Sequence, residues 1–551
     1  MHKALLATPL LALGCAAAPN PTDRAPHHAE STASADDRAW WHDAIFYEVF
    51  VRSFADSSEG PLANDGIGDL RGLIDNLDYL NDGNPRTNTD LGVTALWLMP
   101  IAESASYHGY DVTDYEQVDR EYGTDDDFRQ LIEACHARGI RVIVDHVLNH
   151  CSSDHPWFQA AIDPASPYRD WFIWSDGIPA WVKTQHHLWH ESPAKDGSYY
   201  YGFFWQGMPD LNFHNPAVSR EMMRLSRLWL EDFNADGFRL DAIRHLYEDQ
   251  EVFENLPETH AWLANFNREL KADHPDAFFL GEVWSSSEAI AEYVDGELDA
   301  AFEFQLADAI INAVRDDNAS LVHDQMATVE EVFAGNAFAT FLRNHDQPRL
   351  ANELAGDTEE QKLAASILLT LPGIPFIYYG EEIGMTGTKP DPDIRTPMQW
   401  NGRPGAGFTT ATPWRPVNAD ADTINVERQL NDPDSLRSRY RDFIALRNEH
   451  EALRSGDYLP LHAGNDNALI FYRVTDQQVI ECQFNLSSEP IERLDIPIRE
   501  LLELRRRVFP RGTDFERSTA FSTNTTVGGL SPYAAIITVH TRTDGPARAE
   551  P

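Results

Sequence analysis

Short apolar runs alternate with amphipathic segments along most of the chain, beginning at Trp40. A short apolar run bounded by turn residues is typical of a buried strand, and apolar positions at helical spacing are typical of a covering helix. Helical spacing is clearest at Asp125–Arg138, Ala217–Phe233 and Lys362–Leu371. The strand-like runs are Ile45–Val51, Val93–Met99, Arg141–Asp145, Gly237–Leu240, Ala277–Val283, Ala300–Phe304, Ala339–Leu342 and Pro375–Tyr379. This alternation predicts an α/β fold, and its length favours a (β/α)8 TIM barrel over an open sheet.

One long interval, residues 146–215, interrupts the alternation after the third strand-like run. It is rich in Trp, Tyr, His and Gly, as in WFIWSDGIPAW and YYYGFFW. Because the interval is too long for an ordinary loop, we expect an inserted domain B after strand 3. The barrel would then comprise residues 40–145 and 216–455.

The pattern changes again after the helical segment that ends near residue 450. Apolar and polar positions alternate in Leu469–Arg473, Val479–Asn485 and Ala534–His540, which is typical of half-buried strands. These runs predict a C-terminal antiparallel β-sandwich over residues 456–541, followed by a tail at residues 542–551.

The first residues have the pattern of an export signal. A basic start precedes the apolar run Ala4–Leu13, which is too short to span a membrane as a mature helix. Residues 1–15 resemble a bacterial lipoprotein signal, with Cys15 as the lipidated residue. The alternative is an ordinary export signal cleaved at Ala16–Ala18. We expect an exported protein, either a periplasmic or cell-surface lipoprotein or a secreted one, with residues 16–39 as a disordered tether.

The strong negative charge of the chain limits the classes of partner that it can bind. With a formal net charge of −44 and a pI near 4.7, nucleic acid is excluded as a favourable partner, and we expect membrane contact only through a lipid on Cys15. Only six residues are lysine, and an acidic, lysine-poor surface is typical of salt-adapted proteins; an acidic secreted protein from a GC-rich genome is the alternative. Cys135, Cys151 and Cys482 do not form a disulfide framework by spacing. We expect a monomer.

Carboxylates follow several of the predicted strands. The segment DGFRLDAIRH places Arg239 and Asp241 two residues apart in a strand, so both side chains lie on one face, where the guanidinium can hold the carboxylate ionised. A purely structural ion pair is the alternative for this segment taken alone. Glu282 and Asp346 follow later strands, and in a barrel all three carboxylates converge at the C-terminal rim. Cleavage of a glycosidic bond requires one nucleophilic and one proton-shuttling carboxylate.

The ordered set of motifs resembles glycoside hydrolase family 13, the α-amylase family. The motifs, over residues 40–540, are GVTALWLMPI at 92–101, HGYD at 108–111, DHVLNH at 145–150, MPDLN at 208–212, GFRLDAIRH at 237–245, GEVW at 281–284, RNHD at 343–346 and GIPFIYYGEEIGM at 373–385.

The resemblance implies roles for individual residues. Asp241 would be the nucleophile, Glu282 the general acid/base and Asp346 the stabiliser of the transition state. The mechanism would be a retaining double displacement, for which the two reacting carboxyl groups lie about 5–5.5 Å apart. The residues that would contact or orient the substrate are Arg239, His108, Tyr110, His150 and His345, together with Arg244 and His245 at the leaving-group subsite.

The MPDLN motif, with Pro397–Trp400 reading PMQW, resembles the bacterial α-amylases intermediate between oligo-1,6-glucosidases and neopullulanases. We therefore expect endo-hydrolysis of α-1,4-glucosidic bonds in starch, glycogen and maltooligosaccharides, with possible transglycosylation. The alternatives are an exo-acting α-glucosidase or oligo-1,6-glucosidase on short maltooligosaccharides, and a glucosyltransferase such as trehalose synthase. The intact set of carboxylates argues against a non-catalytic glucan-binding protein.

An acidic, glycine-containing loop follows the first strand. Carboxylate and carbonyl oxygens suit Ca²⁺, and the candidate ligands are Asp56, Asn64, Asp65, Ile67 and Asp69. A solvated acidic turn is the alternative. The resemblance also implies a second calcium site at Asn149 and His245, where the position expected to hold a further carboxylate is Asn212.

Overall fold

The computed structural model describes most of the chain from residue 38 to residue 543. The described ranges are 38–179, 182, 186–249, 252–294, 296–333, 335, 337–494, 507–508, 515–522, 525–526 and 529–543. The predicted signal at residues 1–15 and nearly all of the predicted tether and tail lie outside these ranges. None of the described helices is long and apolar enough to cross a membrane.

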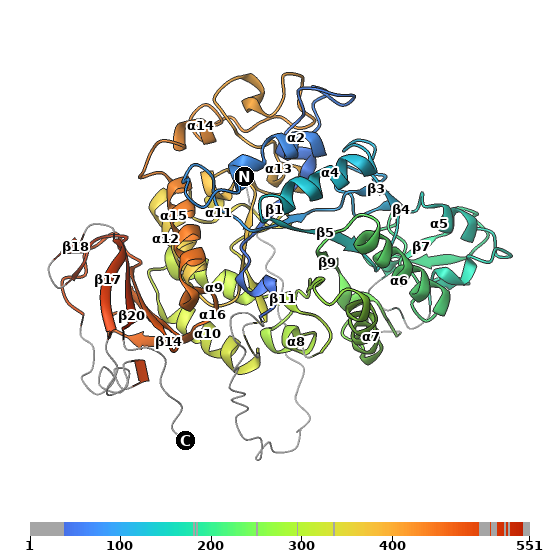
Figure 1. The fold of residues 1–551 in the computed structure, drawn as a ribbon. Helices are drawn as coiled ribbons and strands as arrows, with labels where there is room; N and C mark the ends of the chain where they lie inside the picture. Colours follow the sequence, from blue (N-terminus) through green and yellow to red (C-terminus); the bar gives the residue numbers. More distant parts are fainter. Residues whose placement is uncertain are drawn as a thin grey trace, which may run out of the picture. The chain divides into compact units, whose positions relative to one another are not determined.

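Eight parallel strands close into a barrel, which confirms the predicted TIM-barrel fold (Figure 1). Their order around the barrel is β1-β13-β12-β11-β10-β9-β5-β2. The strands are β1 (Phe46–Val49), β2 (Ala95–Leu98), β5 (Arg141–Val147), β9 (Gly237–Asp241), β10 (Phe278–Gly281), β11 (Ala300–Phe302), β12 (Phe338–Thr340) and β13 (Ile374–Tyr378). Each coincides with a run predicted from the sequence.

Helices surround the barrel, and their ends are fixed by recognisable capping residues. Thr124 and Asp127 form a capping box at the start of α4, and Asn215 caps α6 directly before a proline. The apolar faces of the helices pack on the outward-facing strand residues, whereas large side chains such as Trp97, Phe302 and Phe376 fill the barrel interior. The longer helices are α4 (Asp125–His136), α6 (Pro216–Glu231), α7 (Pro257–Asp273), α9 (Phe304–Arg315), α10 (Ser320–Val332), α12 (Thr358–Thr370) and α15 (Leu436–Glu449).

Shorter elements decorate the C-terminal ends of the strands. After β5, the third barrel strand, an insertion contains the small antiparallel sheet β6-β8-β7 and is tied to the end of β5 by a bridge between His150 and Asp210. The short elements are α1 (Val51–Phe54), α2 (Leu70–Asp75), α3 (Leu77–Leu80), β3 (Ala102–Ser104), β4 (Val112–Val118), α5 (Pro156–Ala161), β6 (Trp174–Ser175), β7 (Trp189–Glu191), β8 (Tyr199–Tyr201), α8 (Ser287–Glu292), α11 (Leu350–Glu353), α13 (Asp391–Ile394), α14 (Val426–Gln429) and α16 (Glu451–Ser455).

A five-stranded antiparallel sheet, in the order β14-β15-β16-β20-β17, forms the C-terminal part (Figure 1). One face contributes Phe471 and Ile537 to the main core, and the other face packs in a smaller cluster with Ile491 and Leu530. This confirms the predicted C-terminal antiparallel strands. The strands are β14 (Asp457–His462), β15 (Ala468–Val474), β16 (Gln478–Asn485), β17 (Phe515–Ser522) and β20 (Ala535–Arg542), and β18 (Thr525–Thr526) and β19 (Gly529–Leu530) form a separate pair.

Two buried arginines donate to backbone carbonyls at the end of α12. Arg447 of α15 donates to the carbonyl oxygens of Leu369 and Leu371, and Arg473 of β15 donates to that of Thr370 at 2.7 Å. The last carbonyls of a helix have no partner within the helix. The arginines supply that partner, one of them from the C-terminal sheet.

Candidate active site

Arg239 stands at the centre of a buried cluster at the C-terminal end of the barrel. Its Nη1 lies 2.7 Å from an oxygen of Asp241 and 2.9 Å from one of Asp145. Its Nη2 lies 2.9 Å from an oxygen of Glu282. One guanidinium therefore holds three carboxylates that come from the ends of β5, β9 and β10.

The backbone after β9 helps to place Glu282. Ala242 has a φ of 50°, so the chain turns sharply after Asp241. In this turn the Ala242 amide donates a hydrogen bond to the Glu282 carboxylate at 3.1 Å. The two carboxylates predicted to react are thus held by a shared arginine and by one short turn, and their predicted separation of about 5–5.5 Å stays a prediction.

Burial and the neighbouring charges act on the ionisation of Asp241 in opposite directions. Burial raises the pKa of Asp241 well above its usual value, and the charges of Glu282 and Asp145 add to that shift. Arg239 acts in the opposite direction and favours the ionised carboxylate. Three carboxylates around one guanidinium leave an excess of negative charge, which favours a proton held by the cluster.

Asp346 lies at the opposite side of the barrel in a more strongly cationic setting. Arg395 approaches one of its oxygens at 2.8 Å, and Nε2 of His345 lies 3.2 Å from the other. Burial opposes ionisation of Asp346, but His345 and Arg395 more than offset it, and the pKa of Asp346 is lowered. This carboxylate is therefore negatively charged over the ordinary pH range.

His345 is itself held between two carboxylates. Its Nδ1 lies 2.5 Å from Glu48, a buried residue of β1. Burial disfavours the charged ring, yet Asp346 and Glu48 outweigh this and raise the pKa of His345 to about 9. At neutral pH His345 is therefore a buried cation that links Glu48 to Asp346.

Tyr110, His108 and His150, which are also predicted to contact the substrate, lie beside these buried groups. The Tyr110 hydroxyl lies 3.0 Å from Asp145 and 2.7 Å from Nε2 of His345. His108 accepts a hydrogen bond from the Tyr110 amide at Nδ1. Burial, with a further contribution from His108, lowers the pKa of His150 to about 3, and Nε2 of His150 has no partner among the described residues. The neutral imidazole thus offers Nε2 to a hydroxyl group, while its Nδ1 lies 3.4 Å from the Asn149 amide nitrogen.

Arg244 and His245 form the wall beyond Glu282. Arg244 pairs with Glu254 at 2.9 Å and donates to the carbonyl oxygen of Trp284. Nδ1 of His245 lies 2.6 Å from the carbonyl oxygen of Phe253, and its ring stacks on Phe203 with centroids 3.9 Å apart. Arg244 thus contacts the second residue after Glu282, and the place of Arg244 and His245 at the leaving-group subsite stays a prediction.

Exposed aromatic side chains gather at this wall. Trp284 is 46% exposed, and Phe204 and Trp205 are 45% and 47% exposed. The Phe204 ring lies 5.0 Å from His150, and the Trp284 ring stacks on Phe304 at 4.7 Å. Aromatic rings that remain exposed beside a buried polar cluster offer flat apolar surfaces to a ligand.

Three residues of the cluster were missed or left without a role by sequence reasoning. Asp145 opens the DHVLNH motif and could have been assigned, because a buried carboxylate beside an arginine needs a partner. Glu48 is a charged residue inside the apolar run of β1, which was a usable signal. Arg395 lies in an irregular segment, and no pattern in the sequence connects it with Asp346.

The carboxylates of the predicted calcium loop accept hydrogen bonds from backbone amides. Asp56 accepts from the amides of Asn64 and Gly66, each at 2.9 Å, and Asp69 accepts from the amides of Ser57 and Gly72.

The remaining candidates of the loop are engaged in the same way. Asp65 accepts from the amide of Ile67 at 2.8 Å, and Asn64 accepts from the hydroxyl of Thr410. Groups of three or more His, Cys, Asp or Glu side chains placed to hold a metal ion do not occur in the described part of the chain. These donors occupy part of the acceptor capacity of the loop, and the calcium site stays a prediction.

The second predicted calcium site differs in one residue. Asn149 donates to Asp210 at 3.0 Å, whereas Asn212 donates away from it, to the carbonyl oxygen of Asp170. The carboxylate beside Asn149 is thus Asp210, whereas Asn212, at the position where the resemblance implies a further carboxylate, turns toward Asp170. Burial raises the pKa of Asp210 to about 7.

Comparison with known proteins agrees with this geometry. A family model described as "Alpha amylase, catalytic domain" matches residues 48–456. The chain belongs to the α-amylase family, glycoside hydrolase family 13. Alpha-amylase 3 of Dictyoglomus thermophilum is 41% identical over 475 residues, covering 84% of this chain and 90% of that protein.

Relatives in the α-amylase family differ in their printed activities. A trehalose synthase/amylase of Mycolicibacterium smegmatis is 36% identical over 527 residues, covering 83% of this chain and 86% of that protein. The crystal structure of an α-amylase from H. orenii has a TM-score of 0.78 at 36% identity, covering 90% of this chain and 99% of that one. The family is therefore established, and the specific reaction has to be argued from the site.

Proposed function

We propose that this member of the α-amylase family hydrolyses internal α-1,4-glucosidic bonds of α-glucans with retention of configuration. The observation that carries the proposal is the arrangement of Asp241 and Glu282 on a single guanidinium, with Asp346 on the other side of the barrel. Two carboxylates that share one guanidinium suit double displacement, in which the carboxyl groups lie too close together for the water of a direct displacement.

The proposed reaction has two steps. Asp241 attacks the anomeric carbon while Glu282 gives its proton to the glycosidic oxygen, and the bond between that carbon and oxygen breaks. Water then attacks the anomeric carbon as Glu282 takes its proton, and Asp241 leaves as a carboxylate. Arg239 pairs with both carboxylates and favours the ionised form of Asp241 that the attack needs. The ionised Asp346 stabilises positive charge on the sugar ring.

The exposed aromatic residues support cleavage within a chain. Trp284, Phe204 and Trp205 are exposed, and Trp284 lies two residues after Glu282, where Arg244 of the predicted leaving-group subsite donates to its carbonyl oxygen. Flat apolar rings stack on sugar rings, so several of them suit a leaving group of more than one residue. The likeness to an α-amylase at 41% identity supports the same activity.

The second candidate is transfer of the glycosyl group to a sugar. The same aromatic surface would hold a sugar acceptor in place of water, and a relative with 36% identity is named a trehalose synthase/amylase. The third candidate is an exo-acting glucosidase, which would release glucose alone from the start of the reaction.

A product time course on starch, maltotriose and pullulan tests the proposal. We expect a mixture of maltooligosaccharides early in starch hydrolysis and loss of product in Glu282→Gln with starch binding retained. Glucose as the sole early product would overturn endo-cleavage in favour of the exo-acting alternative. Trehalose or longer oligosaccharides from maltotriose as the main products would favour transfer.

A further inference from the structure

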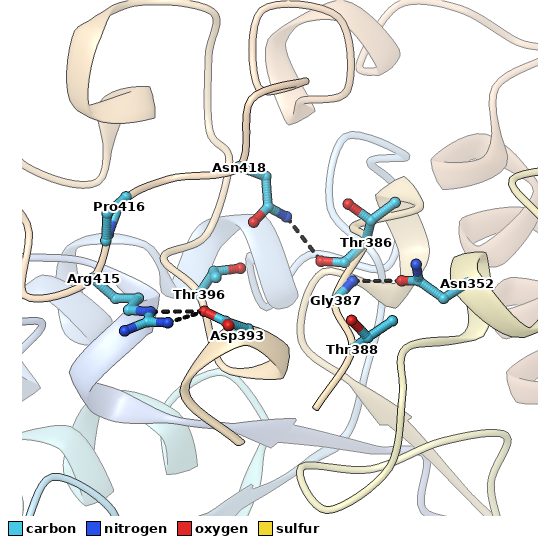
Figure 2. A pocket seen from close by; sticks show the side chains of 9 residues that line it. All are labelled: Asn352, Thr386, Gly387, Thr388, Asp393, Thr396, Arg415, Pro416 and Asn418. Carbon is cyan, nitrogen blue, oxygen red and sulfur yellow. Dashed lines mark hydrogen bonds and ion pairs between the residues drawn. The ribbon is translucent and has the colours of Figure 1, made fainter. Parts of the chain in front are cut away.

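A polar cavity of about 510 Å³ lies beside the chain segment that carries Arg395 (Figure 2). One wall is formed by residues 386–388, and the opposite wall by Asp393 and Thr396. The residues used below are Asn352, Thr388, Asp393, Thr396, Arg415 and Asn418. None of the residues given roles in the proposed reaction lines this cavity.

The lining presents hydrogen-bonding groups without net charge. Asp393 and Arg415 neutralise each other, with the Arg415 Nε 2.8 Å from the carboxylate (Figure 2). Asn352 uses its carbonyl oxygen to accept from the Gly387 amide, which leaves its NH₂ group for a ligand. Asn418 donates from its NH₂ group to the Thr386 carbonyl oxygen, which leaves the side-chain oxygen of Asn418 to accept from a ligand. Donors and acceptors thus remain on both sides.

One lining group lacks a partner although it is buried. Thr396 is only 4% exposed, and its hydroxyl has no hydrogen-bond partner in the described part of the structure. A buried hydroxyl without a partner is costly. A ligand that bonds to this hydroxyl from within the cavity would remove the cost.

These features select the class of ligand. A charged ligand would be repelled by one member of the Asp393–Arg415 pair, and the lining has no aromatic ring for an apolar ligand. A neutral molecule with many hydroxyl groups satisfies both donors and acceptors. The cavity lies within the range of about 300–1,000 Å³ that small-molecule sites occupy, which is enough for a disaccharide.

The cavity is also connected to the catalytic cluster. Arg395 precedes Thr396 and donates to Asp346 at 2.8 Å and to the His345 carbonyl oxygen at 2.9 Å. Arg349 ties both walls together, because its amide donates to the Gly387 carbonyl and its Nε to the Ile394 carbonyl. A ligand between the walls would therefore restrain the segment that positions Asp346.

We propose that this cavity binds a neutral mono- or disaccharide, with maltose as the size that fits, and that its occupancy acts on Asp346 through Arg395. The binding part stands on the cavity alone. The effect on the rate rests on the proposed hydrolysis of α-glucans.

Replacement of Thr388 tests the binding. Thr388 is exposed and makes no hydrogen bond in the described part of the chain, so Thr388→Trp fills the cavity without breaking a contact. Thr358, an exposed threonine at the start of α12, provides the matched control Thr358→Trp. Both changes are made in the full chain carrying Glu282→Gln, so that maltose is not consumed during calorimetric titration.

We expect two maltose-binding events in the Glu282→Gln protein and in its Thr358→Trp derivative, and one in its Thr388→Trp derivative. An equal number of binding events in all three proteins, or a single event in the Glu282→Gln protein, would overturn the site. A folded Thr388→Trp protein is verified by an unchanged thermal midpoint. If Thr388→Trp lowers the midpoint, Thr388→Arg, which blocks the cavity from its exposed rim, replaces it.

Initial rates on starch test the connection to Asp346. With the unaltered protein and with Thr358→Trp, we expect low maltose concentrations to raise kcat/KM about fivefold, the lower range of ordinary coupling between sites. With Thr388→Trp, basal activity is unchanged and maltose only inhibits. An identical response to maltose in all three proteins would overturn the coupling. If Thr388→Trp removes one maltose-binding event but the unaltered protein hydrolyses no α-glucan, the proposed function is overturned and the maltose site in the cavity is retained.

Discussion

The buried chain Glu48–His345–Asp346 leads to a prediction on stability. We consider Glu48→Gln, which keeps the size of the side chain and removes its charge. His345 has a pKa raised to about 9, from an ordinary value of 6.5, because Asp346 and Glu48 outweigh the effect of burial. A raised pKa means that the folded protein holds the proton more tightly than the unfolded chain.

The size of the effect follows from the shift. A difference of about 2.5 pKa units corresponds to about 3 kcal/mol, since one unit is about 1.4 kcal/mol. This stabilisation is fully present below pH 6.5 and is lost as the pH rises through 9. Asp346 remains in Glu48→Gln, so we expect roughly half of the effect, about 1.5 kcal/mol, to persist.

Thermal unfolding between pH 6 and pH 10 measures both quantities. The variant is expected to be least stable relative to the unaltered protein near pH 6, and the difference should shrink by about 1.5 kcal/mol toward pH 10. For a chain of this size, about 1 kcal/mol moves the midpoint by roughly 1 °C. Glu331→Gln, at an exposed position of α10, should follow the unaltered protein at every pH. A stability difference for Glu48→Gln that stays constant with pH would refute the reasoning, because His345 would then not be the titrating group.

Three further predictions concern the rim of the barrel. Trp284→Ala should lower kcat/KM on long maltooligosaccharides about fivefold, because it removes about 1 kcal/mol of stacking, and should have a smaller effect on maltotriose. Equal losses of kcat/KM on both substrates would contradict a role of Trp284 at the leaving-group side. Arg395→Lys cannot reach both Asp346 and the His345 carbonyl as the guanidinium does, so kcat should fall about tenfold with little change in KM; an unaltered kcat would contradict this. Because the Asp56 and Asp69 carboxylates already accept N–H donors, EDTA should leave the thermal midpoint within about 1 °C; a larger fall reversed by Ca²⁺ would restore the calcium prediction.

The barrel was predictable because each strand depends on local sequence. The run Gly237–Leu240 is apolar except for Arg239, and the run at residues 374–378 is bounded by Gly373, so both are recognisable without knowledge of their neighbours. The reacting carboxylates were predictable for the same reason, since Asp241 and Glu282 directly follow such strands. The first strand was predicted too long, because the chain enters the short helix α1 at Val51.

The partners of these carboxylates were not predictable from local patterns. Glu48 and His345 are 297 positions apart, and their contact exists only because the barrel closes. Arg395 reaches Asp346 from an irregular segment 49 positions away. The contact of the acidic loop with Thr409 is of the same kind: its hydroxyl donates to Asp56 from 353 positions along the chain. Side chains that meet through closure of the fold carry no spacing signal.

The arginine that closes the end of α12 affects how this enzyme can be recombined with its relatives. Arg473 belongs to β15 but completes the hydrogen bonding of a barrel helix at the Thr370 carbonyl, and burial lowers its pKa only to about 10, so it remains a cation. Exchange of the C-terminal sheet for an unrelated β-domain would remove this donor and leave a buried carbonyl without a partner. A chimaera would therefore need an arginine at the equivalent point of its first hairpin. The C-terminal sheet is therefore structurally coupled to the barrel and is not an independently exchangeable domain.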